Sequence, residues 1–129
     1  MNSERFNGQK TFTAMQLKAD ILNAMNKNTE ADAVMKDAMT IATMNDIHQY
    51  GKSLLTAGKN EKAVEIFKLN REKNKDDKFT TFVGLARGYT ATGNKKEAIK
   101  NWEIALKNIP ENQKANTAAF QEELKKLKN

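Results

Sequence analysis

The sequence of 129 residues contains few side chains of the kinds that perform catalysis or bind metals. Its single histidine is His48, and it contains no cysteine. A zinc site needs several nitrogen or sulfur ligands, which one histidine does not supply. The carboxylate pairs Asp76–Asp77 and Glu122–Glu123 are sequence neighbours, which diverge by about 100° on a helix and so do not share a site. We predict a protein that is not an enzyme, has no metal or cofactor, and holds His48 partly exposed on a helix.

Basic residues offer a second kind of chemistry, the binding of anions. The net charge is +6; residues 1–64 hold 8 Lys/Arg against 7 Asp/Glu, and residues 65–129 hold 14 against 9. Phosphate binding requires a contiguous basic stripe, preferably with exposed aromatic rings. Here the lysines alternate with glutamates, and Trp102 and Phe120 are needed for the core. Binding of nucleic acid or another polyanion is therefore the second hypothesis, behind protein binding.

Apolar spacing predicts the helices that would position these side chains. One set falls at i, i+3, i+4 and i+7, on one face of a helix, and a second set repeats the pattern after a break. The two sets are Phe82, Leu85, Ala86 and Tyr89, then Ala98, Ile99, Trp102, Ala105 and Leu106. Between them, Gly93 can end the first helix in a left-handed conformation. Asn94 with Glu97 can cap the second, which Pro110 ends.

This hairpin resembles the tetratricopeptide repeat (TPR), whose pattern is W-x₂-L-G-x₂-Y, A-x₃-F and P with a period of about 34 residues. The chain reads Phe82-x₂-Leu85-Ala86-x₂-Tyr89, then Ala98-x₃-Trp102, then Pro110. The resemblance implies an all-α superhelix, a TPR solenoid of helical hairpins. It also implies a module that binds a peptide or partner segment in a concave groove.

Two weaker copies of the hairpin precede it. The small residues Ala31, Ala63 and Ala98 are spaced by 32 and 35, and Asn26 stands where the turn glycine is expected. A first helix over about 12–25 would carry Met15, Ala19, Leu22 and Met25 on one face.

We therefore expect a single domain over 11–129 that follows a flexible lead-in, residues 1–10. Its repeats are predicted at about 12–43, 44–78 and 79–112, with Asp76 or Asp77 capping the first helix of the third. A capping helix over 113–128 would complete the array. Its apolar stripe would be Ala115, Ala119, Phe120, Leu124 and Leu127.

The resemblance also supplies candidate groove residues, taken by register from the first helix of each repeat. They are Asp20, then His48, Lys52 and Leu55, then Arg87 and Thr90, with Lys114 added by the capping helix. The family's clamp for a C-terminal carboxylate uses lysine and asparagine at set places, and this pattern is not matched. Lys52 and Arg87 are 35 residues apart, one repeat interval, which favours a partner segment that carries acidic groups.

A looser resemblance extends over most of the chain. The segments FTAMQLKADIL, ADAVMKDAM, HQYGKSLL and VGLARGY are similar to the C-terminal repeats of a bacterial family of exported proteins in which a β-rich domain precedes the repeats. This implies a periplasmic or exported location for a structural domain of a larger protein. The sequence as it stands shows no apolar leader in MNSERFNGQK and no run near 18 apolar residues, which favours a cytoplasmic protein without membrane insertion. The sequence does not indicate the oligomeric state.

Overall fold

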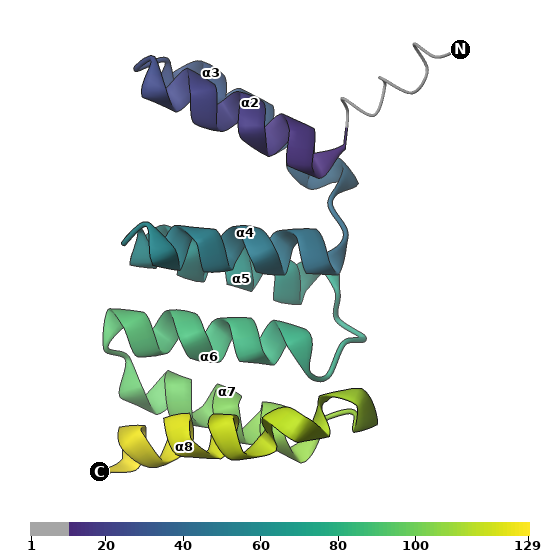
Figure 1. The fold of residues 1–129 in the computed structure, drawn as a ribbon, viewed down its shortest axis with the longest axis vertical. Coiled ribbons are helices and arrows are strands. Elements are labelled where there is room, and N and C mark those ends of the chain that lie inside the picture. The colour runs from purple at the N-terminus through teal and green to yellow at the C-terminus, as the bar shows by residue number, and fades with distance from the viewer. Residues whose placement is uncertain (1–10) are drawn as a thin grey trace. The chain divides into compact units, whose positions relative to one another are not determined.

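The computed structural model describes residues 11–129 and is all-helical over that range (Figure 1). Among these residues there are seven α-helices, one 3₁₀ helix and no strand, which confirms the predicted all-α class. The elements are α2 (Phe12–Ala24), α3 (Asn28–Ile41), α4 (Met44–Thr56), α5 (Asn60–Lys73), α6 (Thr80–Thr92), α7 (Lys95–Lys107), η2 (Glu111–Asn116) and α8 (Thr117–Lys128). The predicted lead-in, residues 1–10, lies outside the described residues.

The helices fall into two units, one that ends at Asp46 and one that covers Ile47–Asn129. The first unit holds the hairpin of α2 and α3. The second holds most of α4 and everything after it, and within it α6 packs against α5 and α7, while α8 packs against α7 (Figure 1). Each unit is described by itself.

The turns of the three hairpins share one conformation. Each turn residue is left-handed, with φ of 63° at Asn26, 79° at Gly58 and 80° at Gly93. In each, the next backbone N–H donates to a carbonyl five residues earlier, as in a Schellman motif. These bonds are Lys27 to Leu22 at 2.8 Å, Lys59 to Leu54 at 2.8 Å and Asn94 to Tyr89 at 2.9 Å. The predicted left-handed turns at Asn26 and Gly93 are therefore confirmed.

Asn94 also behaves as predicted, because its side chain accepts a hydrogen bond from the Glu97 backbone N–H at 3.4 Å. The start of α6 differs from the prediction, which placed the N-cap at Asp76 or Asp77. Phe79 is the residue that precedes the helix, but the carboxylate of Asp77 accepts from the backbone N–H groups of Phe79 and Thr81. Asp77, one of the two predicted caps, thus satisfies these donors from two residues before the observed N-cap position.

In the first unit, α2 packs against α3 through small residues. Ala19, Ala31 and Ala38 are fully buried there. Met25 was predicted to lie on the apolar face of this first helix, and that prediction was wrong, since the residue is 54% exposed. Met25 is the C-cap residue of α2, at the point where the chain turns toward α3, so it does not continue the helix face. Leu17 and Ile21, which lie within α2, are also exposed, at 60% and 52%.

In the second unit, the ring of Phe67 fills a space left by glycines. A Cβ added to Gly51 of α4 would lie 2.3 Å from the ring of Phe67, and one added to Gly84 of α6 would lie 2.5 Å from it. Real Cβ atoms do not approach other atoms so closely. The absence of side chains at these glycines therefore lets α5 lie against both α4 and α6.

The C-terminal part of the second unit closes around Trp102, which is 1% exposed as predicted for a core residue. Its ring centroid lies 5.2 Å from that of Phe120 on α8, and Leu124 and Leu127 pack against the same cluster. The capping helix differs from the prediction at its start. After Pro110, the polar segment Glu111–Asn116 forms η2, and α8 begins only at Thr117.

The predicted apolar stripe of the capping helix is therefore shorter than expected. Ala115 lies in η2 rather than in α8, and both Ala115 and Ala119 are exposed. A side-chain bond from Asn116 Nδ2 to Gln113 Oε1, at 2.7 Å, joins residues within η2. The burial of α8 depends on Phe120 and on the leucines that follow it.

Candidate functional site

The predicted groove residues of the second unit lie on three elements. His48, Lys52 and Leu55 are on α4, Arg87 and Thr90 are on α6, and Lys114 is on η2. Asp20 is exposed on α2, in the other unit, so the site described here is confined to residues 47–129.

His48 was expected to be partly exposed, and that expectation was wrong, because the residue is only 8% exposed. Its ring centroid lies 5.8 Å from that of Phe67, so it packs against the same α5 side chain that the glycines accommodate. Its Nδ1 is buried and has no hydrogen-bond partner. A neutral imidazole has one donor and one acceptor nitrogen, and the one at Nδ1 is closed to solvent and faces the protein interior.

The electrostatic surroundings keep His48 neutral. Burial, then the charges of Lys52 and Arg87, lower the pKa of His48 from 6.5 to about 4, and the opposite effect of Asp77 is smaller. Burial acts in this direction because it disfavours the charged imidazolium. At neutral pH the residue is therefore uncharged, and the two cations near it set a positive potential in the site.

Arg87 is a half-buried cation with aromatic rings beside it. Its guanidinium carbon lies 5.7 Å from the ring centroid of Trp102 and 5.9 Å from that of Phe120. Within residues 11–129 no carboxylate forms an ion pair with it, and its Nε is buried without an acceptor. The guanidinium thus lies beside two aromatic rings of the core, and its Nε is closed to solvent.

The remaining candidates contribute less. Lys52 is exposed, and no ion pair joins it to another described residue. The hydroxyl of Thr90 donates to the Ala86 carbonyl at 2.7 Å and is therefore occupied by its own helix. Leu55 is half-buried, and Lys114 is exposed. The charges of Lys52 and Arg87 both act on His48, and these three residues form the candidate site.

Sequence reasoning missed a hollow formed by α5, α6 and α7. Its volume is about 290 Å³. Arg71 lies over the ring of Phe82 at 4.4 Å, and Lys68 lies 6.0 Å from the ring centroid of Tyr89. The sequence assigned both aromatic residues to the core, whereas both are half-buried. One signal in the sequence could have indicated this surface. Two basic residues, Lys68 and Arg71, stand on α5, the helix that precedes Phe82 and Tyr89.

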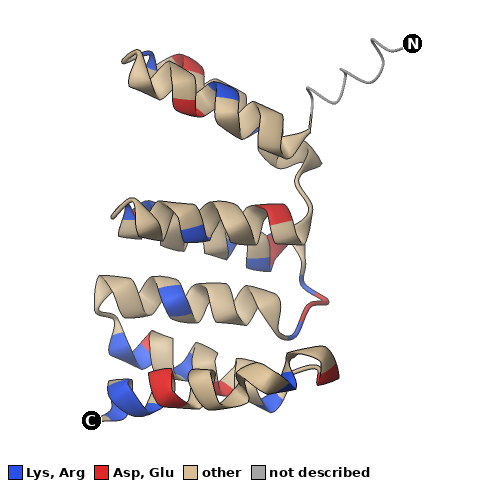
Figure 2. Ribbon diagram, in the orientation of Figure 1, with Lys and Arg blue, Asp and Glu red and all other residues tan. Residues whose placement is uncertain are grey.

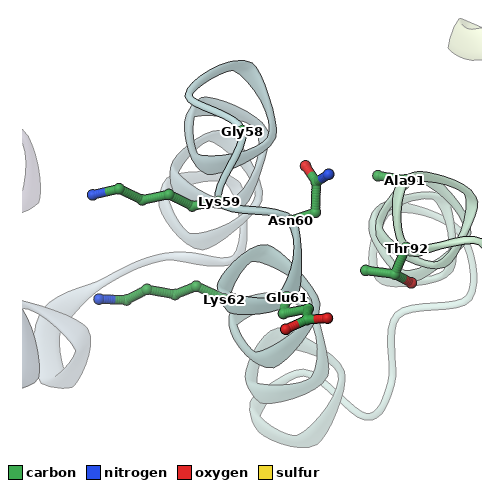
Figure 3. A pocket seen from close by; sticks show the side chains of 7 residues that line it. All are labelled: Gly58, Lys59, Asn60, Glu61, Lys62, Ala91 and Thr92. Atoms are coloured by element: carbon green, nitrogen blue, oxygen red, sulfur yellow. The ribbon is translucent and has the colours of Figure 1, made fainter.

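A wider hollow of about 610 Å³ lies between the turn after α4 and the end of α6. In Figure 3, Asn60 and Glu61 point toward Ala91 and Thr92, while the side chains of Lys59 and Lys62 extend away from them. Lys59 and Lys62 line the hollow, but their ammonium groups point away from its α6 side. In the part of the chain that the structure describes, no group of three or more His, Cys, Asp or Glu side chains could hold a metal ion.

Charge is unequal between the units. Residues 47–129 hold 17 Lys/Arg against 10 Asp/Glu, a net charge of +7, whereas residues 11–46 hold 3 against 5. Figure 2 shows that basic residues gather on α7 and α8, with acidic residues among them. Two of these lysines form ion pairs, Lys128 with Glu103 at 3.1 Å and Lys126 with Glu123 at 3.8 Å.

Comparison with known proteins yields no relative. No family model matches the sequence, and neither a curated protein nor a solved structure matches it. None of the helices between Thr11 and Asn129 has the length and apolar character needed to cross a membrane. A function must therefore be inferred from the geometry and charges of the chain itself.

Proposed function

We propose that this chain is a TPR-like helical-repeat module that binds a segment of a protein partner and performs no catalysis. The three hairpins support this, because they share the left-handed turn residue and the same set of buried small residues. At corresponding positions stand Ala19, Gly51 and Ala86, then Ala31, Ala63 and Ala98. Repeats of this kind stack to form extended binding surfaces.

The observation that carries the proposal is a pair of cations on α4 and α6. Lys52, which is exposed, and Arg87, which is half-buried, both act electrostatically on His48. No carboxylate among residues 11–129 forms an ion pair with either of them. A segment with acidic residues that lies against this face would supply the missing partners. Complementary charge of this kind sets orientation and association rate more than affinity, so we expect micromolar binding.

A peptide array tests the proposal. The wild type is compared with a Lys52→Glu, Arg87→Glu double variant whose helix content and thermal transition show that it is folded. A Lys100→Glu, Lys107→Glu variant is the matched control, because it makes the same change of charge on α7. The first variant should lose the acidic ligands of the wild type, and the control should retain them. Equal binding by all three proteins would exclude this face as the site.

The excess positive charge of residues 47–129 supports a second candidate, binding of nucleic acid or another polyanion. Trp102 and Phe120 are buried, so neither is available to stack on bases. We expect weak binding without sequence preference that is lost at physiological ionic strength, because phosphate contacts weaken steeply as salt rises. Tight, salt-resistant binding to a defined oligonucleotide would place this candidate first.

A further inference from the structure

We propose that the hollow between α5, α6 and α7 is a second docking site, where a partner segment inserts one large apolar side chain that has an acidic residue on either side. The hollow is the one lined by Phe82 and Tyr89, and it is called the aromatic hollow below. It shares no residue with the site formed by His48, Lys52 and Arg87, so this inference does not rest on the proposed function.

The aromatic hollow lies on the opposite side of α6 from Arg87. Phe82, Leu85 and Tyr89 all line it, and their spacing of three and four residues places them on one face of the helix. Successive residues of an α-helix are about 100° apart, so Arg87 lies roughly 140–160° around the helix from each of the three. A segment bound in the hollow therefore contacts a different surface from a segment bound at Arg87.

The shape of the aromatic hollow suits a single side chain. Its volume is about 290 Å³, at the lower end of the roughly 300–1,000 Å³ of pockets that enclose whole small molecules. Phe82, Tyr89 and Ile104 of its lining are half-buried, whereas Leu85 is buried. Most of the binding energy of a protein interface comes from a few large side chains that fill pockets of this kind. These apolar walls therefore favour one apolar anchor residue.

Arg71 is held in the lining without a ligand. Its guanidinium carbon lies 4.4 Å from the ring centroid of Phe82. The guanidinium donates to the Thr81 hydroxyl and to the carbonyls of Lys75 and Asp77. None of these acceptors is a carboxylate, so the positive charge of Arg71 is not neutralised by its partners. Arg71 thus fixes one wall of the hollow and makes it positive.

Two exposed lysines add charge from the helices on either side of α6. Lys68 of α5 has its Nζ 6.0 Å from the ring centroid of Tyr89, and Lys100 of α7 also lines the hollow. No ion pair joins either lysine to another residue of the described range 11–129. With Arg71, three cations in the lining stand against one carboxylate, that of Glu97, a net charge of +2.

This charge selects the occupant. Acidic residues on both sides of the apolar anchor would pair with the lysines of α5 and α7, and complementary charge of this kind orients a partner and rejects wrong ones. An aromatic pocket can also bind a methylated lysine. Here the cations beside Phe82 and Tyr89 repel such a ligand, so the acidic segment is the better match.

Calorimetry of the full chain with four pentapeptides tests the site. All are acetylated and amidated, and alanine fills the second and fourth positions. The first peptide has phenylalanine at the centre and glutamate at both ends. The second has alanine at the centre, the third has glutamine at both ends, and the fourth has lysine at both ends.

We expect saturable binding of the first peptide. Without the anchor, the second peptide should bind about tenfold more weakly or worse. The third should bind several-fold more weakly, and the fourth should not bind, because its charges oppose those of the hollow. Equal binding of the first two peptides would overturn the inference, and so would tighter binding of the fourth than of the first.

Variants move the charge of the lining in both directions. Lys68→Glu, Lys100→Glu changes two exposed residues and should weaken binding of the first peptide tenfold or more. Glu97→Gln removes the single carboxylate of the lining and should tighten binding several-fold, a gain that damage to the fold would not produce. Ile104→Phe narrows the hollow without a change of charge and should weaken binding. Circular dichroism checks that each variant is folded.

The matched control is Lys52→Glu, Arg87→Glu, which makes the same change of charge on the other side of α6 and should bind the first peptide as the wild type does. Unchanged binding by the folded Lys68→Glu, Lys100→Glu variant would overturn the inference. Loss of binding in the control alone would also overturn it, because the peptide would then occupy the Arg87 face.

The peptide array separates this inference from the proposed function. Array ligands with a large apolar residue between two acidic ones should be retained by the Lys52→Glu, Arg87→Glu variant and lost by the Lys100→Glu, Lys107→Glu variant, which changes a lysine of the hollow. Ligands of the Arg87 face should show the reverse. If every ligand that is lost is lost from the first variant alone, the proposed function stands and the aromatic hollow is not a docking site.

Discussion

Gly84 and Phe67 are fitted to each other across the contact of α6 with α5. A Cβ on Gly84 would lie 2.5 Å from Cδ1 of Phe67. A neighbouring position, Gly88, repeats the relationship, since a Cβ there would lie 2.9 Å from Val64 and 3.2 Å from Phe67. The close approach of the two helices thus depends on two glycines that would otherwise weaken the interior of α6.

Gly84→Ala should destabilise the protein, although alanine is the better helix former by about 1 kcal/mol. The added methyl group would overpack the contact with Phe67, at a cost of roughly 1–3 kcal/mol. Urea unfolding measures the effect. In a double-mutant cycle, Phe67→Leu should relieve much of the cost, so the two changes should be non-additive. Additive effects would mean that the glycine is not matched to the ring.

Trp102→Ala should lower the free energy of unfolding by roughly 3–5 kcal/mol, the range for truncation of a buried aromatic residue. The loss should be concentrated in α6, α7 and α8, because α7 packs against the other two helices. In the wild type, emission from Trp102 should be that of an indole shielded from water. A water-exposed spectrum together with a neutral alanine variant would contradict the packing described here.

Asp77→Ala should destabilise the start of α6, whereas Asp76→Ala should not. The Asp77 carboxylate accepts from the backbone N–H of Thr81 at 2.7 Å and from the Thr81 hydroxyl at 2.8 Å. Arg71 donates to the same hydroxyl and to the Asp77 carbonyl. Loss of a helix cap costs about 1 kcal/mol and sometimes 2, measurable as a lower thermal transition. Asp76 is exposed and is the matched control; equal effects of the two changes would contradict this role.

His48 should make stability depend on pH. Its pKa is lowered from 6.5 to about 4 in the folded protein, so between these values the unfolded chain binds more protons. The contribution of neutral His48 to the free energy of unfolding is therefore fully present above pH 6.5. It is lost as the pH falls toward 4, by up to about 3 kcal/mol. His48→Phe cannot titrate and should lose less stability over that range. Parallel pH profiles of the two proteins would show that His48 is not held neutral by the fold.

The helices and turns could be predicted because local residues determine them. Gly93 takes the left-handed conformation its position requires, and Asn94 caps the helix that follows. The recurring small residues are likewise buried where their spacing indicated. Asn26 shows that a left-handed turn can be recognised even where glycine is replaced.

The site was less predictable, because burial depends on the elements that pack over a residue. His48 was expected on a partly exposed face of a helix, but it is buried against Phe67 of α5, which sequence spacing does not position. The contact of Arg87 with Phe120 depends on how α8 returns along α7. The late start of α8 also escaped prediction, since η2 is a polar segment without a periodic pattern.

The glycines that receive Phe67 also give the hairpins a fixed order. The intervals of 32 and 35 residues place Leu17 and Ile21 at the register positions of Gly84 and Gly88. The α2–α3 hairpin shares the turn and the buried alanines of the third hairpin, yet it could not replace that hairpin after α5, because two large side chains would stand where a methyl group already clashes. Hairpins that are alike in backbone are therefore not interchangeable in this chain. An engineer who duplicates a hairpin must transfer each glycine face together with the aromatic residue of the preceding helix.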